Sequence, residues 1–198
     1  MGRVRAYVGL GANLGAVAET LAVAVHALGA LPGARIQGVS RLYATDPVGV
    51  VDQPEFRNAV VALDVPSGHT PEEGAVALLL ALKAIERAFG RQPREHWGPR
   101  EVDLDLLIFG RHQVELARPA SGRSPDPAKA SLPLTVPHRE ARHRLFVLAP
   151  LSDLAAGLVP PGWGVTVGVA AARQRVLEGA GAARPIARWA DTGWAPLP

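Results

Sequence analysis

The stretch HWGPREVDLDLLIFG, residues 96–110, decides the fold of this chain. It starts as a turn and continues as an apolar strand that carries two aspartates, Asp103 and Asp105. Because side chains of a strand alternate between its faces, both carboxylates are predicted on one face. The apolar residues are predicted on the opposite face, toward the core: Val102, Leu104, Leu106 and Ile108.

The two aspartates have the spacing of a site for divalent cations. Their Cα atoms are predicted about 6.7 Å apart, and carboxylates that lean together can serve two cations about 3.5–4 Å apart. Carboxylate and phosphate oxygens are the ligands that Mg²⁺ prefers. The alternative, in which both side chains lie on the solvent face of an edge strand, stays open. A D-x-D motif is by itself weak evidence for one function, since unrelated enzymes such as polymerases also use it.

The loop before this strand is rich in arginine. Arg91, Arg94 and Arg100 could close over a triphosphate and stabilise the charge of a transferring phosphate group. For Arg94 the alternative is an ordinary solvated residue. Trp97 either packs the loop or covers a nucleotide.

The rest of the chain predicts an α+β fold with helices on a mostly antiparallel sheet. The clearest helix start is Thr70, with proline at the first helical position and Glu73 at the third. Residues 9–15 (GLGANLG) are predicted as a glycine-rich turn and residues 45–55 as a loop. The other predicted elements are strands at 3–9, 36–44 and 56–65 and helices at 16–31 and 70–89.

The C-terminal half is less clearly patterned. Residues 117–133 are rich in proline, serine and alanine and are predicted as a mobile insertion. A short helical region follows, and the tail from residue 159 is weakly patterned, with a helix near 165–175. The whole chain, 1–198, is interpreted as one domain.

Composition narrows the class of protein. The 198 residues are 48% hydrophobic and 20% charged, with a net charge of +3 and no cysteine. Disulfides, thiol nucleophiles and cysteine-ligated zinc are excluded, and a cytoplasmic location is expected. The sequence has no apolar run long enough to cross a membrane and no clustered basic tail, so we expect neither a membrane anchor nor a nucleic-acid partner.

Four motifs in order resemble the 6-hydroxymethyl-7,8-dihydropterin pyrophosphokinase family of folate biosynthesis. They are YVGLGANLG (7–15), TDPVGVVDQPEFRNAV (45–60), WGPREVDLDLLIFG (97–110) and LTVPHREARHRLFVLAPL (134–151). The resemblance implies a ferredoxin-like, three-layer αβα fold. It also implies transfer of the β,γ-diphosphate of ATP to the pterin hydroxymethyl group, with release of AMP and with two Mg²⁺ ions as cofactors.

The resemblance also implies roles for individual residues. Asp103 and Asp105 match the magnesium ligands, and Arg91 and Arg100 match the catalytic loop arginines. The pterin would be bound by Thr45, Val48, Phe56, Asn58 and Phe146. ATP would be bound by Glu86, Arg91, Trp97, Arg100, Thr135, His138 and Arg144.

From the residues alone, several of these positions could have purely structural roles. Phe56 and Phe146 could be core aromatics, Asn58 could cap a turn, and His138 could start a helix. The chain also departs from the family pattern. The connection 117–133 is long, Pro133 stands where family members can carry an arginine, and the other departures are Ala12, Asp46, Lys83 and Arg139.

Other classes of function fit the sequence less well. The third glycine of GLGANLG is one residue too late for a dinucleotide fingerprint, and no P-loop motif is present. An RNA-binding sheet needs exposed aromatic side chains, but only 5% of residues are aromatic. The main alternative is another magnesium-dependent nucleotidyltransferase with a D-x-D site. For the kinase we expect a monomer whose partners are ATP and the pterin.

Overall fold

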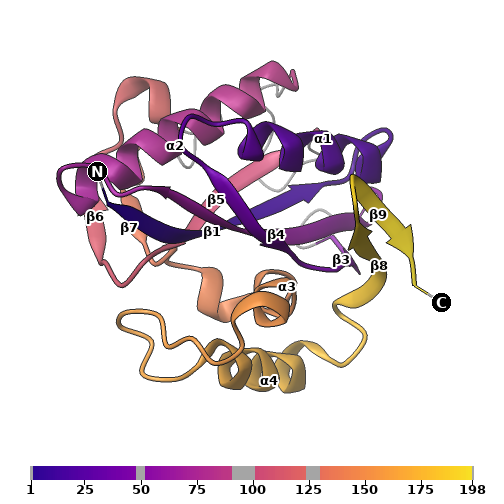
Figure 1. Ribbon diagram of the computed structural model, residues 1–198. Coiled ribbons are helices and arrows are strands. Elements are labelled where there is room, and N and C mark those ends of the chain that lie inside the picture. Colours follow the sequence, from indigo (N-terminus) through magenta and orange to yellow (C-terminus); the bar gives the residue numbers. More distant parts are fainter. Residues whose placement is uncertain (1, 48–51, 91–100, 124–129, 198) are drawn as a thin grey trace.

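The computed structural model describes residues 2–47, 52–90, 101–123 and 130–197, and its centre is a seven-stranded sheet (Figure 1). The strand order is β5-β1-β4-β3-β8-β9, with β2 paired to β4 beside β3, and every pair recorded between these strands is antiparallel. The strands are β1 (Arg3–Ala12), β2 (Arg35–Val39), β3 (Leu42–Thr45), β4 (Phe56–Pro66), β5 (Asp103–Phe109), β8 (Arg184–Ala190) and β9 (Gly193–Pro196).

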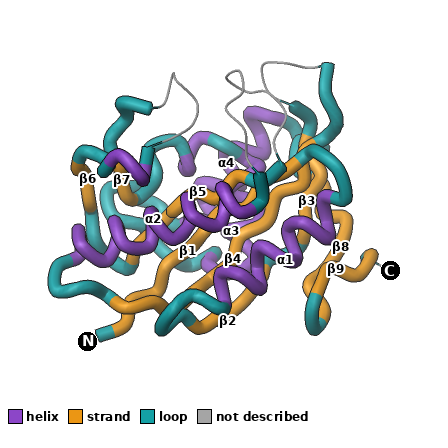
Figure 2. Tube along the Cα trace, turned by 90° about the horizontal axis from the view of Figure 1, so that it is seen from above, coloured by secondary structure: helices purple, strands orange, loops and turns teal. Residues whose placement is uncertain are grey.

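Helices cover both faces of this sheet (Figure 1). α1 (Val17–Gly29) and α2 (Pro71–Ala88) lie on one face, and α3 (Leu145–Ala155) and α4 (Val167–Glu178) lie on the other. A small sheet of β6 (Val114–Leu116) and β7 (Leu134–Val136) lies at the end of the molecule opposite to β8 and β9 (Figure 2). In the described part of the chain, no helix is both long and apolar enough to span a membrane.

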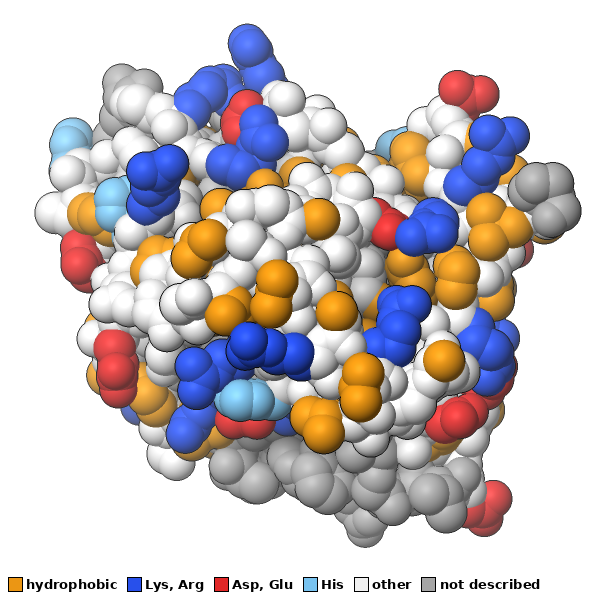
Figure 3. Space-filling model, turned by 90° about the horizontal axis from the view of Figure 1, so that it is seen from below, with side chains coloured by type: hydrophobic (Ala, Val, Ile, Leu, Met, Phe, Trp, Pro, Cys, Tyr) orange, Lys and Arg blue, Asp and Glu red, His pale blue; other side chains and the backbone are white. Residues whose placement is uncertain are grey.

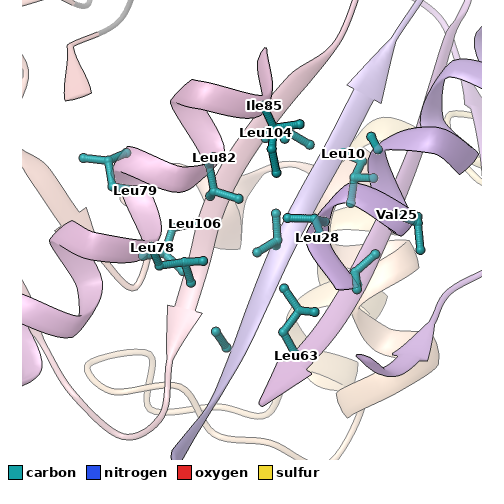
Figure 4. Packing of buried hydrophobic residues seen from close by; sticks show 14 of the residues in the cluster. Leu10, Val25, Leu28, Leu63, Leu78, Leu79, Leu82, Ile85, Leu104 and Leu106 are labelled. Atoms are coloured by element: carbon teal, nitrogen blue, oxygen red, sulfur yellow. The ribbon is translucent and has the colours of Figure 1, made fainter. Parts of the chain in front are cut away.

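The larger hydrophobic core lies between the sheet and the helices α1 and α2 (Figure 4). Leu28 of α1 and Leu82 of α2 are fully buried there against Leu10 of β1 and Leu104 of β5. Burial of one such side chain contributes about 1.5–3 kcal/mol. A second cluster packs the other face of the sheet against α3 and α4. The strand β5 is therefore held from both sides.

The predicted start of α2 is confirmed. The Glu73 N–H donates to the Thr70 hydroxyl at 3.2 Å, and the Glu73 carboxylate accepts from the His69 N–H at 3.2 Å. Thr70 is the N-cap and Pro71 is the first helical residue. The cap fixes where α2 begins and hence which of its side chains reach β5.

Two predictions near the N-terminus were wrong in detail. Residues 9–12 belong to β1 and not to a turn, because β4 pairs with all four and β5 pairs with residues 9–11. The strand predicted at 36–44 is two strands that divide at Ser40. The Ser40 hydroxyl accepts from the Val60 N–H at 2.9 Å and donates to the Arg41 carbonyl, so a side chain replaces part of the backbone ladder.

The prediction for Ile108 was also wrong. Val102, Leu104 and Leu106 pack in the α1 and α2 core as expected, but Ile108 lies in the α3 and α4 cluster and Phe109 takes the expected side. The register between β1 and β5 shifts between Tyr7 and Val8, which skips Leu107. Such a bulge inserts one residue and reverses the facing of every residue after it.

Regular structure is described in part of the insertion and in the tail, while residues 124–129 of the predicted mobile insertion lie outside the described residues. Within 117–133, the short 3₁₀ helix η1 (Ala120–Gly122) packs on α2, where the Arg87 guanidinium donates to the Ser121 carbonyl at 3.1 Å. The helix predicted near 165–175 is α4. The tail also adds β8 and β9 to the main sheet, with β8 paired to β3.

Candidate active site

Two glycines of β1 leave room for a cleft on the α3 side of the sheet. Gly11 pairs with Asp103 of β5 and with Asn58 of β4, and Gly9 pairs with Asp105 and with Val60. Residues paired across strands point to the same face. Because glycine has no side chain, the space between the aspartates and Asn58 stays open, over about 10 Å at two strand spacings.

The cleft has a volume of about 420 Å³ and brings most of the predicted site residues together. It is bounded by the sheet, by the segment before α3 and by the C-terminal end of α4. The predicted residues that line it are Thr45, Phe56, Asn58, Asp103, Asp105, Arg144 and Phe146. The others include Gly9, Gly11, Asp46, Leu107, His143 and Glu178.

One wall presents a fixed amide. The Asn58 amide N–H donates to the Thr45 hydroxyl at 2.8 Å, and these residues are only 7% and 4% exposed. Phe56 follows on the same wall as the first residue of β4. Asn13, at the end of β1, donates to the Gln53 side chain and to the Pro54 carbonyl at 3.0 and 3.1 Å, which fastens the chain just before Phe56.

A second wall, at the start of α3, combines an aromatic ring with basic groups. Arg144 lies at the N-cap of α3, with its guanidinium 5.7 Å from the centre of the Phe146 ring. Arg142 donates from Nε to Nε2 of His143 at 2.8 Å, so the other ring nitrogen of His143 carries the proton when the imidazole is neutral. This wall thus offers donors to an anion beside an apolar surface.

Near its C-terminal end, α3 is fixed to β3 and to the residue before it by an ion pair and a hydrogen bond. Asp153 accepts from the backbone and guanidinium of Arg41 and, at 2.9 Å, from the Tyr43 hydroxyl. Burial and the Asp153 carboxylate raise the pKa of Tyr43, and the bond to Asp153 raises the pKa of Arg41. The pair holds the last turn of α3 against the sheet.

The C-terminal tail contributes to the site, which sequence reasoning missed. Glu178 of α4 lines the cleft and accepts from the Leu145 N–H at 2.9 Å, so it satisfies a free donor at the start of α3. Arg184 of β8 pairs with Glu55, next to Phe56. Arg184 and Arg57 together lower the pKa of Glu55. The contacts of Glu178 and Arg184 could not be predicted from local patterns, because they join residues 33 and 129 positions apart.

Three predicted nucleotide ligands do not line the cleft. Glu86 of α2 is buried at 2% exposure and pairs with Lys83. Thr135 lies on β7, opposite Glu115. The His138 N–H donates to the Leu107 carbonyl at 2.8 Å, which places His138 along the outer edge of β5. Val48, Arg91, Trp97 and Arg100 lie outside the described residues.

The carboxylate pair fits a hard divalent cation. Asp103 and Asp105 share one face of β5 and are partly exposed at the cleft. Among the described residues, no group of three or more His, Cys, Asp or Glu side chains could hold a metal ion. An ion bound by the two aspartates would therefore also take oxygens from water and from the ligand. That donor set is typical of Mg²⁺ at phosphate sites.

Comparison with solved structures defines the fold class. The structure of Plasmodium falciparum wild-type HPPK-DHPS with pterin and p-hydroxybenzoate matches 99% of this chain with a TM-score of 0.73 at 14% identity. An HPPK-DHPS structure in complex with substrates matches 100% of it with a TM-score of 0.72 at 12% identity. The chain spans about half the length of each, 48%. This α+β sheet with helices on both faces is thus the fold of one part of such proteins.

Sequence comparison then shows the particular family. Residues 7–156 match the 7,8-dihydro-6-hydroxymethylpterin-pyrophosphokinase (HPPK) family. The 2-amino-4-hydroxy-6-hydroxymethyldihydropteridine pyrophosphokinase of Pseudomonas aeruginosa is 41% identical over 157 residues, which are 79% of this chain and 84% of that protein. Its counterpart in Bacillus subtilis is 36% identical over 149 residues, 75% of this chain and 77% of that protein. The chain belongs to the HPPK family.

Proposed function

We propose that this protein transfers the β,γ-diphosphate of ATP to 6-hydroxymethyl-7,8-dihydropterin, a step of folate biosynthesis that releases AMP. The observation that carries the proposal is the single cleft in which an acidic pair, a buried amide, two phenylalanines and an arginine meet. The family match across residues 7–156 supports the same reaction.

The pterin fits the wall of Asn58 and Thr45. Because the Asn58 amide N–H is bonded to Thr45, the direction of the amide is set before the substrate arrives. An amide offers a donor and an acceptor to the amino-keto edge of a pterin. Phe56 and Phe146 both line the cleft. Stacking of a flat ring between two aromatic rings would contribute about 0.5–1.5 kcal/mol beyond the buried area.

Asp103 and Asp105 would hold two Mg²⁺ ions together with the phosphates of ATP. Bound there, the ions would neutralise phosphate charge and lower the pKa of the attacking hydroxyl. Asn58 and Thr45 would orient the pterin, and the two carboxylates lie across Gly9 and Gly11 from Asn58. Arg144 would donate to phosphate oxygens. Arg91 and Arg100, which precede β5 in the sequence, would do the same.

We further propose that Trp97, Thr135 and His138 bind the nucleotide and that Val48 contacts the pterin through its backbone. Thr135 and His138 follow the outer edge of β5, so a nucleotide there would have its phosphates directed to the aspartates. The strand order β5-β1-β4-β2, with α1 and α2 as connections, supports a ferredoxin-like core. A monomer in the cytoplasm, with these small molecules as partners, completes the proposal.

Product analysis tests the reaction. The protein is incubated with ATP, Mg²⁺ and the reduced pterin alcohol, and the nucleotide products are separated. The proposal predicts AMP and a pterin diphosphate in equal amounts. Release of pyrophosphate would support the alternative, a nucleotidyltransferase, and would contradict a diphosphate transfer.

Replacement of Asp105 tests the metal site. Asp105→Asn keeps the size of the side chain but removes the charge, and we expect turnover to fall at least about a hundredfold. Thermal unfolding should stay within a few degrees of the wild type, since Asp105 is partly exposed. Asp46→Asn, which changes another acidic residue of the cleft, is the matched control. Activity retained in Asp105→Asn would remove this residue from the metal site.

A further inference from the structure

A buried ion pair on α2 faces the strand that carries the two aspartates. Lys83 and Glu86 are one turn apart, and Lys83 Nζ lies 2.7 Å from Glu86 Oε1. Their side chains are 5% and 2% exposed. Charged residues are rarely buried this deeply unless they are paired, and burial of two charges costs several kcal/mol per ion before their attraction is counted. The position therefore calls for an explanation beyond stability.

Both members of the pair bond to the backbone of one residue, Leu104. The Leu104 N–H donates to Glu86 Oε1 at 2.7 Å, and Lys83 Nζ donates to the Leu104 carbonyl at 3.3 Å. Leu104 stands between Asp103 and Asp105, and its own side chain is fully buried in the core. The same Glu86 oxygen thus links Lys83 and the strand.

These hydrogen bonds replace the ones that a neighbouring strand would make to β5. β5 is the edge strand of the described sheet, with β1 on its inner side. The outward N–H and C=O of an edge strand have no strand partner and allow the strand to shift or fray. Here α2 supplies one acceptor and one donor at Leu104, and the His138 N–H covers the Leu107 carbonyl further along.

We propose that Lys83 and Glu86 are positioning residues that hold the backbone between the two aspartates and thereby set the direction of both carboxylates. The proposal rests on the proposed function for the role of the aspartates. Two like charges on neighbouring positions repel, so without a cation the strand is pushed to separate them. Fixing Leu104 at both backbone groups keeps the pair ready for the ion.

This role differs from the nucleotide contact implied for Glu86 by the family resemblance. Glu86 projects from α2 into the core on the side of the sheet opposite to the cleft, where it contacts Lys83 of α2 and Leu104 of β5. The ion pair acts on the site through the backbone of β5, in the way that groups behind a metal ligand orient it.

Two double variants isolate the bond to Leu104. K83M/E86M removes both charges and both backbone contacts at nearly constant volume. K83M/E86Q also removes both charges but keeps a carbonyl oxygen that can accept from the Leu104 N–H. The two variants differ at one side-chain terminus, so burial and charge are matched between them.

The first measurement is amide hydrogen exchange of Leu104 in the protein without metal or nucleotide. We expect exchange to be at least about tenfold faster in K83M/E86M than in the wild type and to be largely restored in K83M/E86Q. The second is the Mg²⁺ concentration that gives half-maximal binding of a non-hydrolysable ATP analogue. It should rise by about tenfold in K83M/E86M, with recovery in K83M/E86Q, while pterin affinity stays within twofold.

Equal exchange and equal Mg²⁺ dependence in the two double variants would overturn the proposal. So would weaker binding of metal-free ATP in K83M/E86M with Leu104 exchange unchanged, because Glu86 would then be a nucleotide ligand. If K83M/E86M does not fold, amide hydrogen exchange of the wild type still tests the proposal. The proposal requires the Leu104 amide to exchange as slowly as the buried amides of β1. The exchange measurement needs no turnover, so a failure of the proposed reaction in the AMP assay is a separate result.

Discussion

At the scale of single residues, the cleft depends on the absence of side chains at two positions of β1. Gly9 and Gly11 occupy the two positions between the acidic pair and the Asn58 wall. Their backbone does not require glycine, since neither has a positive φ. We infer that these glycines are needed because any side chain would occupy the cleft.

Gly11→Ala should therefore weaken pterin binding. A Cβ at Gly11 would lie 3.0 Å from Asn58 Oδ1 and would project into the cleft. We expect about a tenfold loss of pterin affinity, equivalent to about 1.4 kcal/mol, measured by titration without ATP. Gly157→Ala is the control, because a Cβ there meets no atom within 4 Å. Equal affinity in both variants would show that the pterin does not use this floor.

Phe146→Ala should separate the two substrates. The Phe146 ring lines the cleft and lies under the Arg144 guanidinium. Loss of the ring removes a stacking surface, so pterin affinity should fall by about 2 kcal/mol or more while ATP affinity changes much less. Phe89→Ala, which removes a partly buried ring at the end of α2, is the control. An equal loss of both affinities would make Phe146 a packing residue only.

At the scale of elements, α2 and β5 form one unit. The Thr70 cap sets the start of α2, and Lys83 and Glu86, about four turns later, reach the backbone of Leu104. Because of the bulge at Leu107, the strand packs into both hydrophobic cores, with Leu106 on one face and Ile108 on the other. The aspartates precede the bulge, so their common face is kept.

Gly74 of α2 gives a test of this packing. On helix propensity alone, Gly74→Ala should stabilise the helix by about 1 kcal/mol. A Cβ there would meet the Ser67 carbonyl at 2.2 Å and the Phe109 ring at 2.8 Å. We expect destabilisation by about 1–3 kcal/mol instead, measured by urea unfolding. The exposed Ala84 supplies the reverse control, since Ala84→Gly should cost about 1 kcal/mol.

At the scale of the whole molecule, the tail closes the structure around the site. α4 packs on α3, β8 extends the sheet from β3, and Trp194 of β9 donates to the Ser40 carbonyl at 3.2 Å and packs edge-on to Trp189. Figure 3 views the face of α3 and α4, where arginine and apolar side chains are interspersed. The solved structures match this segment as well, whereas the family match ends at residue 156.

Arg184→Ala should reveal the link between the tail and the cleft. Arg184 is the largest cause of the lowered pKa of Glu55, so the pKa of Glu55 should rise toward its usual value when Arg184 is lost. Because the folded pKa is lowered, this pair adds stability above the usual pKa of a glutamate, near 4.3, and loses it as pH falls through the folded value. Titration by NMR gives the result. An unchanged Glu55 pKa would show that Arg57 alone holds it.

Much of the fold could be read from local patterns, and the reasons are local. The Thr70 cap, the alternation of β4 and the aspartate pair each depend on residues within a few positions of one another. Motif order was enough to indicate the family and the walls of the cleft. The position of Glu86 was not readable in this way, because its partner groups belong to the backbone of another element.

By itself, then, the sequence determined the alternation of helices and strands, the common face of Asp103 and Asp105, and the residue types that a pterin and a polyphosphate require. Only the tertiary structure decided that Gly9 and Gly11 form the floor between them, that a bulge reverses Ile108, and that Glu178 and Arg184 reach the site from the tail. The physical reason is the sequence distance over which each effect acts. Backbone propensity and side-chain alternation act over a few residues, whereas pairing register and burial depend on which distant segments come into contact.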